Sequence, residues 1–184
     1  MFESLLERIA TALDAAAIPY MVIGGQAVLV HGEPRLTRDI DITLGVDIDR
    51  LGQVLAVTAA LGFTPLVDPD KFTRETMVLP CQDAVTTIRI DFIFSFSTYE
   101  RQAIGRACRV RMGRADVRFA SVEDLIVHKI LAGRPRDLED VRAVLNKNPA
   151  TDRSFVRHAL AEFAATLGEP LVERFDGLAA SPES

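Results

Sequence analysis

Apolar and polar residues alternate in several short stretches of the first two thirds of the chain. Successive side chains of a strand point to opposite faces of a sheet, so this alternation predicts strands with one buried face. Alternating or short apolar runs cover residues 19–23, 39–44, 77–80, 86–94, 108–112 and 116–119. Gly113 and Arg114 separate the last two runs, which predicts a tight hairpin. Residues 63–75 show no clear pattern, and we expect a loop there.

A different spacing, with apolar residues three and four positions apart, predicts helices in other parts of the chain. It covers residues 5–16, 26–31, 48–61, 121–132, 137–147 and 151–167. Ser121 and Asp124 resemble a capping box at the start of one of these helices. Strands therefore dominate residues 19–119 and helices the remainder, which predicts an α+β fold.

The length of 184 residues suits a single domain or a sheet domain with a helical addition. We expect a core over residues 1–120 and a helical region over residues 121–184 that packs on this core. The last residues, 180–184, are expected to be a tail. A hydrophobic content of 48% predicts a well-formed core rather than disorder.

Three aspartates provide the clearest sign of chemistry. Asp39 and Asp41 are one residue apart in an apolar run, so a strand would place both on one face, about 7 Å apart. Asp91 lies in a second apolar run, with Arg89 on its own face. If the two strands are neighbours, three carboxylates converge and repel one another unless a divalent cation neutralises them. Mg²⁺ suits oxygen ligands and phosphates, so the pattern predicts a magnesium site, although a lone Asp-x-Asp is also common on exposed strands.

A glycine pair precedes the aspartates. Gly24 and Gly25 end the apolar run 19–23 and open the helix-like segment 26–31. A glycine turn of this kind lets backbone N–H groups approach a phosphate and directs a helix N-terminus toward it. Glycine pairs also end strands without any ligand.

These features resemble, in order and context, the DNA polymerase β-like nucleotidyltransferase superfamily. The resemblance implies a mixed β-sheet flanked by helices, in which the glycine turn and the three carboxylates hold metal and NTP. Residues 35–39, Arg-Leu-Thr-Arg-Asp, resemble the Arg-x-Thr-x-Asp element of the abortive-infection, toxin-related branch. Lys129 and the series Arg134, Asp137 and Asp140 resemble later elements of the same branch, so that the resemblance covers residues 18–145.

Lys129 is also unusual on physical grounds, because it occupies the next place on the apolar stripe of the predicted helix 121–132. We interpret it as a charge for the NTP phosphates or a group near the nucleophile, the alternative being a lysine that snorkels to solvent. Asp137 is a candidate for a catalytic or lysine-pairing role, or else for a helix N-cap. Arg35 and Arg38 are candidate phosphate contacts that could equally form local salt bridges.

The net charge of −5 argues against wholesale coating by nucleic acid. A local basic surface remains, which RNA or nucleotide phosphates could meet, although such a cluster is more often a solvated strand face. Its members are Arg101, Arg106, Arg109, Arg111, Arg114 and Arg118.

The compartment is expected to be the cytoplasm. The chain starts without a basic segment typical of a signal peptide, and Pro19, Gly24 and Gly25 interrupt its longest apolar stretch, which excludes a membrane span there. Cys81 and Cys108 fit no metal spacing and no disulfide framework, which favours reduced thiols.

The sequence therefore predicts a Mg²⁺-dependent nucleotidyltransferase with two metals, which moves NMP from an NTP to an acceptor hydroxyl. Asp39, Asp41 and Asp91 would hold metal, Gly24 and Gly25 would cradle phosphate, and the acceptor would be RNA or protein in a toxin–antitoxin context, with a possible cognate partner protein. One alternative is a small-molecule nucleotidyltransferase of the antibiotic-modifying kind. The other is a non-catalytic, antitoxin-like module that binds nucleotide or protein.

Overall fold

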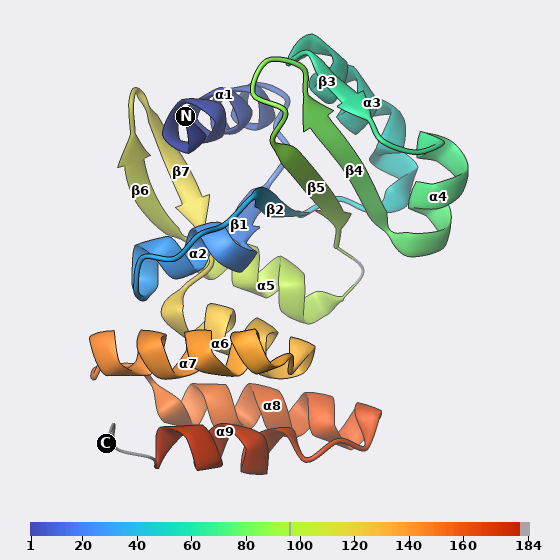
Figure 1. Cartoon of the computed structure of the whole chain (residues 1–184). Coiled ribbons are helices and arrows are strands. Elements are labelled where there is room, and N and C mark those ends of the chain that lie inside the picture. The colour runs from blue at the N-terminus through green and yellow to red at the C-terminus, as the bar shows by residue number, and fades with distance from the viewer. Residues whose placement is uncertain (96, 181–184) are drawn as a thin grey trace. The chain divides into compact units, whose positions relative to one another are not determined.

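The computed structural model describes residues 1–95 and 97–180 (Figure 1). The expected tail therefore lies outside the described residues from 181 onward. The chain forms two compact units, the first of residues 1–26 and 36–120 and the second of residues 27–35 and 121–184. Residues 27–35, which we expected in the core region, thus group with the C-terminal helices.

The first unit contains a mixed β-sheet, which confirms the predicted fold class. In the described residues its seven strands have the order β3-β4-β5-β2-β1-β7-β6. β2 is parallel to β5, and β1 is parallel to β7, whereas the other neighbours are antiparallel. The strands are β1 (Tyr20–Ile23), β2 (Asp39–Leu44), β3 (Phe63–Pro65), β4 (Val78–Asp83), β5 (Arg89–Phe94), β6 (Cys108–Met112) and β7 (Ala115–Phe119).

The alternation in β2 and β5 builds the core of this sheet. Ile40, Ile42 and Leu44 are buried on β2, and their register partners on β5 are Ile90, Phe92 and Phe94, which are equally buried. Phe63 of β3 stacks on Phe92 with ring centroids 6.4 Å apart. Burying each large apolar side chain contributes about 1.5–3 kcal/mol, so this face fixes the strand register.

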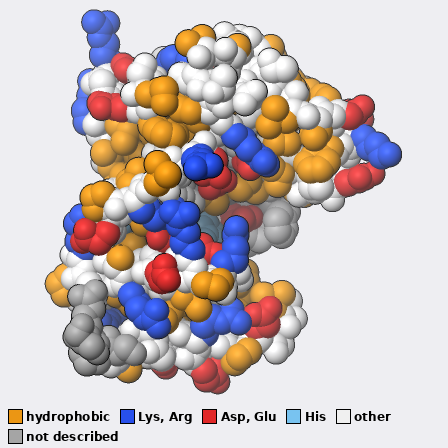
Figure 2. Space-filling model, in the orientation of Figure 1, with side chains coloured by type: hydrophobic (Ala, Val, Ile, Leu, Met, Phe, Trp, Pro, Cys, Tyr) orange, Lys and Arg blue, Asp and Glu red, His pale blue; other side chains and the backbone are white. Residues whose placement is uncertain are grey.

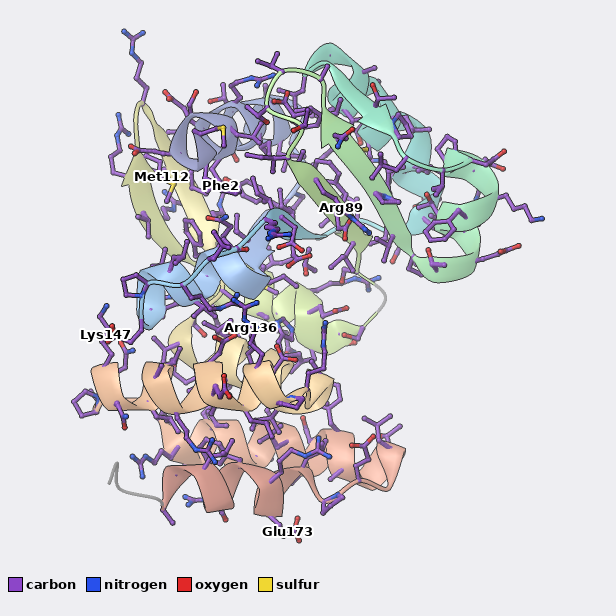
Figure 3. All side chains as sticks on the ribbon, in the orientation of Figure 1. Phe2, Arg89, Met112, Arg136, Lys147 and Glu173 are labelled. Carbon is purple, nitrogen blue, oxygen red and sulfur yellow. The ribbon has the colours of Figure 1, made fainter. Side chains whose placement is uncertain are left out.

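Helices of the first unit flank the sheet. α1 (Phe2–Ala15) buries an apolar stripe and contacts the β6–β7 hairpin, where Figure 3 labels Phe2 and Met112. The 3-10 turn η1 (Ile48–Arg50) leads into α3 (Leu51–Ala60), which contacts β3. α2 (Gly24–His31) follows β1 directly, as the glycine pair predicted, and only its residues up to Gln26 belong to the first unit.

The expected loop at residues 63–75 is wrong, because this stretch forms β3 and most of α4 (Pro69–Thr76). β3 has only three residues, too few to show an alternation. α4 is polar, with Thr73 as its one buried residue, so no apolar stripe marks it. Its start is set by Asp68, whose side chain accepts a hydrogen bond from the Lys71 N–H, and by proline in the first turn.

α5 (Thr98–Arg106) was also not predicted, for the same reason. Ser97 caps it by accepting from the Glu100 N–H, and Ala103 is its one buried residue. Arg101 and Arg106 therefore lie on a helix and not on the hairpin. The alternative of a solvated strand face therefore does not hold for these two residues.

The second unit is helical in its described part. It contains α6 (Val122–Ala132), α7 (Pro135–Lys147), α8 (Arg153–Leu167) and α9 (Leu171–Ala179), of which α9 was not predicted. α6 contacts all three of the other helices. Ser121 accepts a hydrogen bond from the Asp124 N–H at 3.0 Å and donates one to its carboxylate at 2.8 Å, as the capping box predicted. On the face shown in Figure 2, acidic and basic side chains are interspersed over α7 to α9.

The described part of the chain shows neither a membrane-spanning helix nor a disulfide between its two cysteines. None of its helices has the length and apolar character needed to cross a membrane. Neither Cys81 nor Cys108 forms a disulfide there.

Candidate active site

The two aspartates of β2 share one face of the sheet. Asp39 and Asp41 are half-buried, whereas Ile40 and Ile42 between and after them are fully buried. The apolar residues therefore hold the strand in a register that presents both carboxylates on the opposite face.

The parallel neighbour β5 brings the third carboxylate to the same face. Asp91 is the register partner of Asp41, and Arg89 is the partner of Asp39. Neighbouring strands lie about 4.8 Å apart, so the three aspartates share one face of two adjacent strands.

Arg89 supplies positive charge within this group. Figure 3 labels this residue on β5. Its Nε lies 2.8 Å from Oδ1 of Asp91. This hydrogen bond raises the pKa of Arg89; desolvation opposes the shift, and the charges of Asp91, Asp39 and Asp41 add to it. The guanidinium thus pairs with Asp91 on the face that also carries Asp39 and Asp41.

The glycine turn lies directly against Asp41. Gly24 has φ +63°, and a Cβ at this position would overlap the Asp41 carboxylate. Only glycine combines this left-handed backbone with such a close approach. β1 and β2 are antiparallel, with Ile23 opposite Asp41, so the start of α2 stays beside the aspartates.

Two further residues that we did not predict position Asp39. Thr37 Oγ1 donates to Asp39 Oδ1 at 3.2 Å, and Gln26 Nε2 donates to the Asp39 carbonyl at 3.4 Å. Both side chains are buried. The signal for Gln26 was present, because it is a polar residue at the start of an apolar segment.

The donor set fits Mg²⁺ in chemistry but is not closed around a cation. Carboxylate oxygens are suitable ligands, and the glycine turn allows close approach of a phosphate. Among the described residues, however, no group of three or more His, Cys, Asp or Glu side chains is arranged to hold a metal. Asp91 is turned toward Arg89 instead.

Cys81 on β4 takes no part as an anionic ligand. Burial raises the pKa of its thiol to about 12, and the charge of Asp91 adds to this shift. A thiol with this pKa is neutral at physiological pH, so the candidate ligands are the oxygen donors alone.

A buried charge network lies within the second unit. Lys129 Nζ is 2.7 Å from Oδ1 of Asp137 and 2.9 Å from Oδ2 of Asp140, and only 9% of its side chain is exposed. Arg35 Nε lies 2.9 Å from Asp140 Oδ1, and exposed Arg134 lies 3.1 Å from Asp137 Oδ2.

This network decides between the alternatives for two residues. Lys129 does not snorkel to solvent, and Asp137 pairs with it. Asp137 is not an N-cap, because α7 begins at Pro135 with Arg134 in the cap position. Arg35 is engaged by Asp140, whereas Arg38 is exposed.

The segment before Arg35 is held by the end of α7, where Figure 3 labels Lys147. Lys147 Nζ donates to the Gly32 carbonyl at 2.7 Å, and Asn148 Nδ2 donates to the His31 carbonyl at 2.7 Å. Together with Arg35 and Asp140, these contacts explain why residues 27–35 belong to the second unit.

The β6–β7 hairpin carries a basic hollow of about 300 Å³ in the first unit. Arg111 pairs with Asp116 at 3.3 Å, and Arg118 pairs with Asp14 of α1 and lies over the Tyr20 ring. Arg109 and Arg114 are exposed. The hollow is lined by Thr11, Asp14, Arg109, Arg111, Arg114, Ala115, Asp116 and Arg118.

Comparison with known families agrees with this geometry. The family model described as "Nucleotidyl transferase AbiEii toxin, Type IV TA system" matches residues 4–181. The chain belongs to the AbiEii family. The resemblance drawn from the sequence is thereby confirmed, and the enzyme class of this AbiEii member is nucleotidyltransferase.

Solved structures share the fold of this AbiEii chain. ANT(2″)-Ia in complex with adenylyl-2″-tobramycin has 20% identity and a TM-score of 0.63, covering 90% of this chain and 98% of that one. An antigenic nucleotidyltransferase-like protein from Paracoccidioides brasiliensis has 18% identity and a TM-score of 0.56, covering 99% and 94%. At these identities the likeness concerns the fold alone. None of the curated proteins matches the chain.

Proposed function

We propose that this AbiEii member is a Mg²⁺-dependent enzyme that transfers NMP from an NTP to an acceptor hydroxyl and releases pyrophosphate. The observation that carries the proposal is the β2–β5 register, which places Asp41 beside Asp91 with Asp39 on the same face. Family membership supports the class of reaction.

Asp39, Asp41 and Asp91 would hold the metal. When bound there, two Mg²⁺ ions would neutralise the charge of the phosphates and would stabilise the entering and leaving oxygens of an in-line displacement. In this proposal Gly24 and Gly25 leave room for the triphosphate at the first N–H groups of α2, and Asp91 orients the attacking hydroxyl.

Other side chains have supporting roles in the proposal. Exposed Arg38, next to Asp39, is available to a phosphate oxygen, whereas Arg35 is held by Asp140 and orders its own segment. Thr37 and Gln26 keep Asp39 in place. The catalytic roles of Lys129 and Asp137 remain predictions.

The test combines nucleotide binding with transfer. We expect Asp39→Asn and Asp41→Asn to abolish MgATP binding, because each removes a negatively charged metal ligand, while the fold persists. Calorimetric titration of MgATP measures binding, and Asp49→Asn, at an exposed site on η1, is the control. Unchanged affinity in both variants would reject the metal assignment.

RNA is the acceptor that we place first. The arginine-lined hollow on the β6–β7 hairpin supports it, because guanidinium groups pair with the phosphates of a nucleic-acid backbone. Incubation with each labelled NTP, Mg²⁺ and a mixture of tRNA, protein and small-molecule acceptors shows where the label goes. If the label appeared on protein and not on tRNA, protein would replace RNA as the proposed acceptor.

A small-molecule acceptor is the second candidate. It is favoured by the fold shared with ANT(2″)-Ia, which was solved with adenylyl-2″-tobramycin. Label only on a small amine or alcohol would establish this alternative. No label on any acceptor would favour a non-catalytic, antitoxin-like binding module.

The biological setting belongs to the same proposal. The family description names a Type IV toxin–antitoxin system, so we expect a cognate partner protein. The activity is placed in the cytoplasm, where NTPs and RNA are available.

A further inference from the structure

Arg89 occupies a special place among the carboxylates of the candidate active site. It is the first residue of β5, its register partner is Asp39, and its side chain turns to Asp91 two residues along the same strand. Residues i and i+2 of a strand share a face, so Arg89 lies on the face that carries all three aspartates.

We propose that Arg89 is a positioning residue that holds Asp91 in the metal-free protein and must leave it when a divalent cation binds, so that Arg89 sets the metal affinity of the site. The inference rests on the proposed function, because it takes Asp91 to be a metal ligand. It goes beyond that function by assigning a competitor for the metal within the chain itself.

Two of the aspartates near Arg89 repel each other. Asp41 and Asp91 are direct cross-strand neighbours, and like charges in this position destabilise a sheet. A cation near them relieves the repulsion, and the guanidinium of Arg89 supplies one, with its Nε 2.8 Å from Oδ1 of Asp91. Arg89 therefore provides without metal the neutralisation that a metal ion provides when bound.

Arg89 competes with a metal ion for one oxygen of Asp91. Arg89 Nε lies 2.8 Å from Asp91 Oδ1, and a guanidinium donating to this oxygen occupies one of its lone pairs and places a positive charge where a metal would approach. This contact accounts for the open donor set, in which Asp91 does not join the other aspartates.

Arg89 can move away from Asp91. Its side chain is 53% exposed, whereas that of Asp91 is 16% exposed. An exposed arginine can rotate into solvent without opening a cavity, and its planar guanidinium suits a triphosphate oxygen once it is released. The carboxylate thus stays fixed on the sheet while its partner moves.

The test measures metal binding and stability, not turnover. Arg89→Met removes the charge and keeps much of the stem. We expect it to bind Mn²⁺, followed by electron paramagnetic resonance, about 3- to 10-fold more tightly than wild type, as the loss of a partly exposed competing ion pair allows. Its melting temperature should fall without metal and recover at saturating Mn²⁺, because the repulsion is then neutralised. Arg89→Lys, which keeps the charge, should lie between the two.

Arg74→Met is the matched control. The Arg74 side chain is also 53% exposed, and its Nε lies 3.0 Å from Oδ1 of Asp70, but this pair stands on the surface of α4. Its removal should leave Mn²⁺ affinity unchanged. In an Asp91→Asn background, the effect of Arg89→Met on metal-free stability should disappear.

The outcomes separate this inference from the proposed function. Mn²⁺ affinity in Arg89→Met that is equal to or weaker than that of wild type would overturn the inference, because Arg89 would then not compete. Tighter binding without transfer to any acceptor would support the inference and reject the enzymatic proposal. No Mn²⁺ binding in either protein would overturn both.

Discussion

At the scale of single residues, Asp83 shows how one carboxylate stabilises the turn between β4 and β5. Its side chain is 1% exposed and accepts hydrogen bonds from the Thr86 N–H at 2.9 Å, from Thr86 Oγ1 at 2.6 Å and from Arg8 at 3.4 Å. Burial alone would raise the pKa of Asp83, but the Thr86 hydrogen bonds and the Arg8 charge outweigh it and lower the pKa.

The lowered pKa predicts how stability depends on pH. The folded state favours ionised Asp83, so its contribution is complete above the unfolded value of about 3.9 and is lost as the pH falls through the lower folded pKa. We expect Asp83→Asn to lower the free energy of unfolding by about 1–3 kcal/mol at pH 7. Urea unfolding should show a smaller difference from wild type near pH 3. A pH-independent difference would contradict the assignment.

For single residues, the sequence predicted those positions where a chemically distinctive side chain falls at a fixed place in the two-residue period of a strand. Asp39, Asp41 and Gly24 could be placed because alternation and a strand-ending glycine are local properties. That Asp91 lies beside Asp41 follows from strand order, which could only be supposed before the fold was known. The contact of Arg89 with Asp91 depends on a rotamer and on the neighbouring strand, and no sequence pattern specifies it.

At the scale of elements, the same limit applies to helices. α4 and α5 are short, polar and held by their caps, so apolar periodicity did not reveal them. α6 could be predicted because Leu125 and Ile126 are buried and Ser121 caps it. The link from α6 to α7 through Lys129, Asp137 and Asp140 is instead a tertiary property of the second unit.

This link predicts a cost for Lys129→Met that the sequence alone did not suggest. Methionine suits an apolar stripe, so the sequence alone predicts little loss of stability. The structure corrects this expectation, because the substitution leaves Asp137 and Asp140 buried without their shared cation. Breaking such a network costs about 3–5 kcal/mol, reduced here by Arg35 and Arg134.

Chemical denaturation measures this cost, and the triple variant Lys129→Met with Asp137→Asn and Asp140→Asn should recover part of it. Full stability of Lys129→Met would show that the network contributes little. Transfer activity, compared at a temperature where each variant is folded, reports on catalysis separately. Wild-type turnover in Lys129→Met would assign Lys129 to structure alone.

At the scale of the whole molecule, the net charge of −5 conceals a local excess of arginine. The chain passes between its two units at residues 26–27, 35–36 and 120–121, and the arginine hollow belongs wholly to the first unit. The amino-acid composition could not show this, because it averages over both units. The hairpin pattern, in contrast, places Arg109, Arg111 and Arg118 on two paired strands and Arg114 in the turn between them.

If RNA binds at this hollow, its affinity should fall steeply with salt, because each neutralised phosphate releases counterions. We expect Arg109→Glu with Arg111→Glu to weaken tRNA binding and to make the slope of log K against log salt shallower by about 1–2, since each lost contact to a single strand removes about 0.7. MgATP binding should not change. Lys71→Glu with Arg74→Glu on α4 is the control, because both residues are exposed and the charge change is equal. If this control weakens tRNA binding equally, net charge and not the hollow governs RNA affinity. Binding that does not depend on salt would reject RNA as the ligand of this surface.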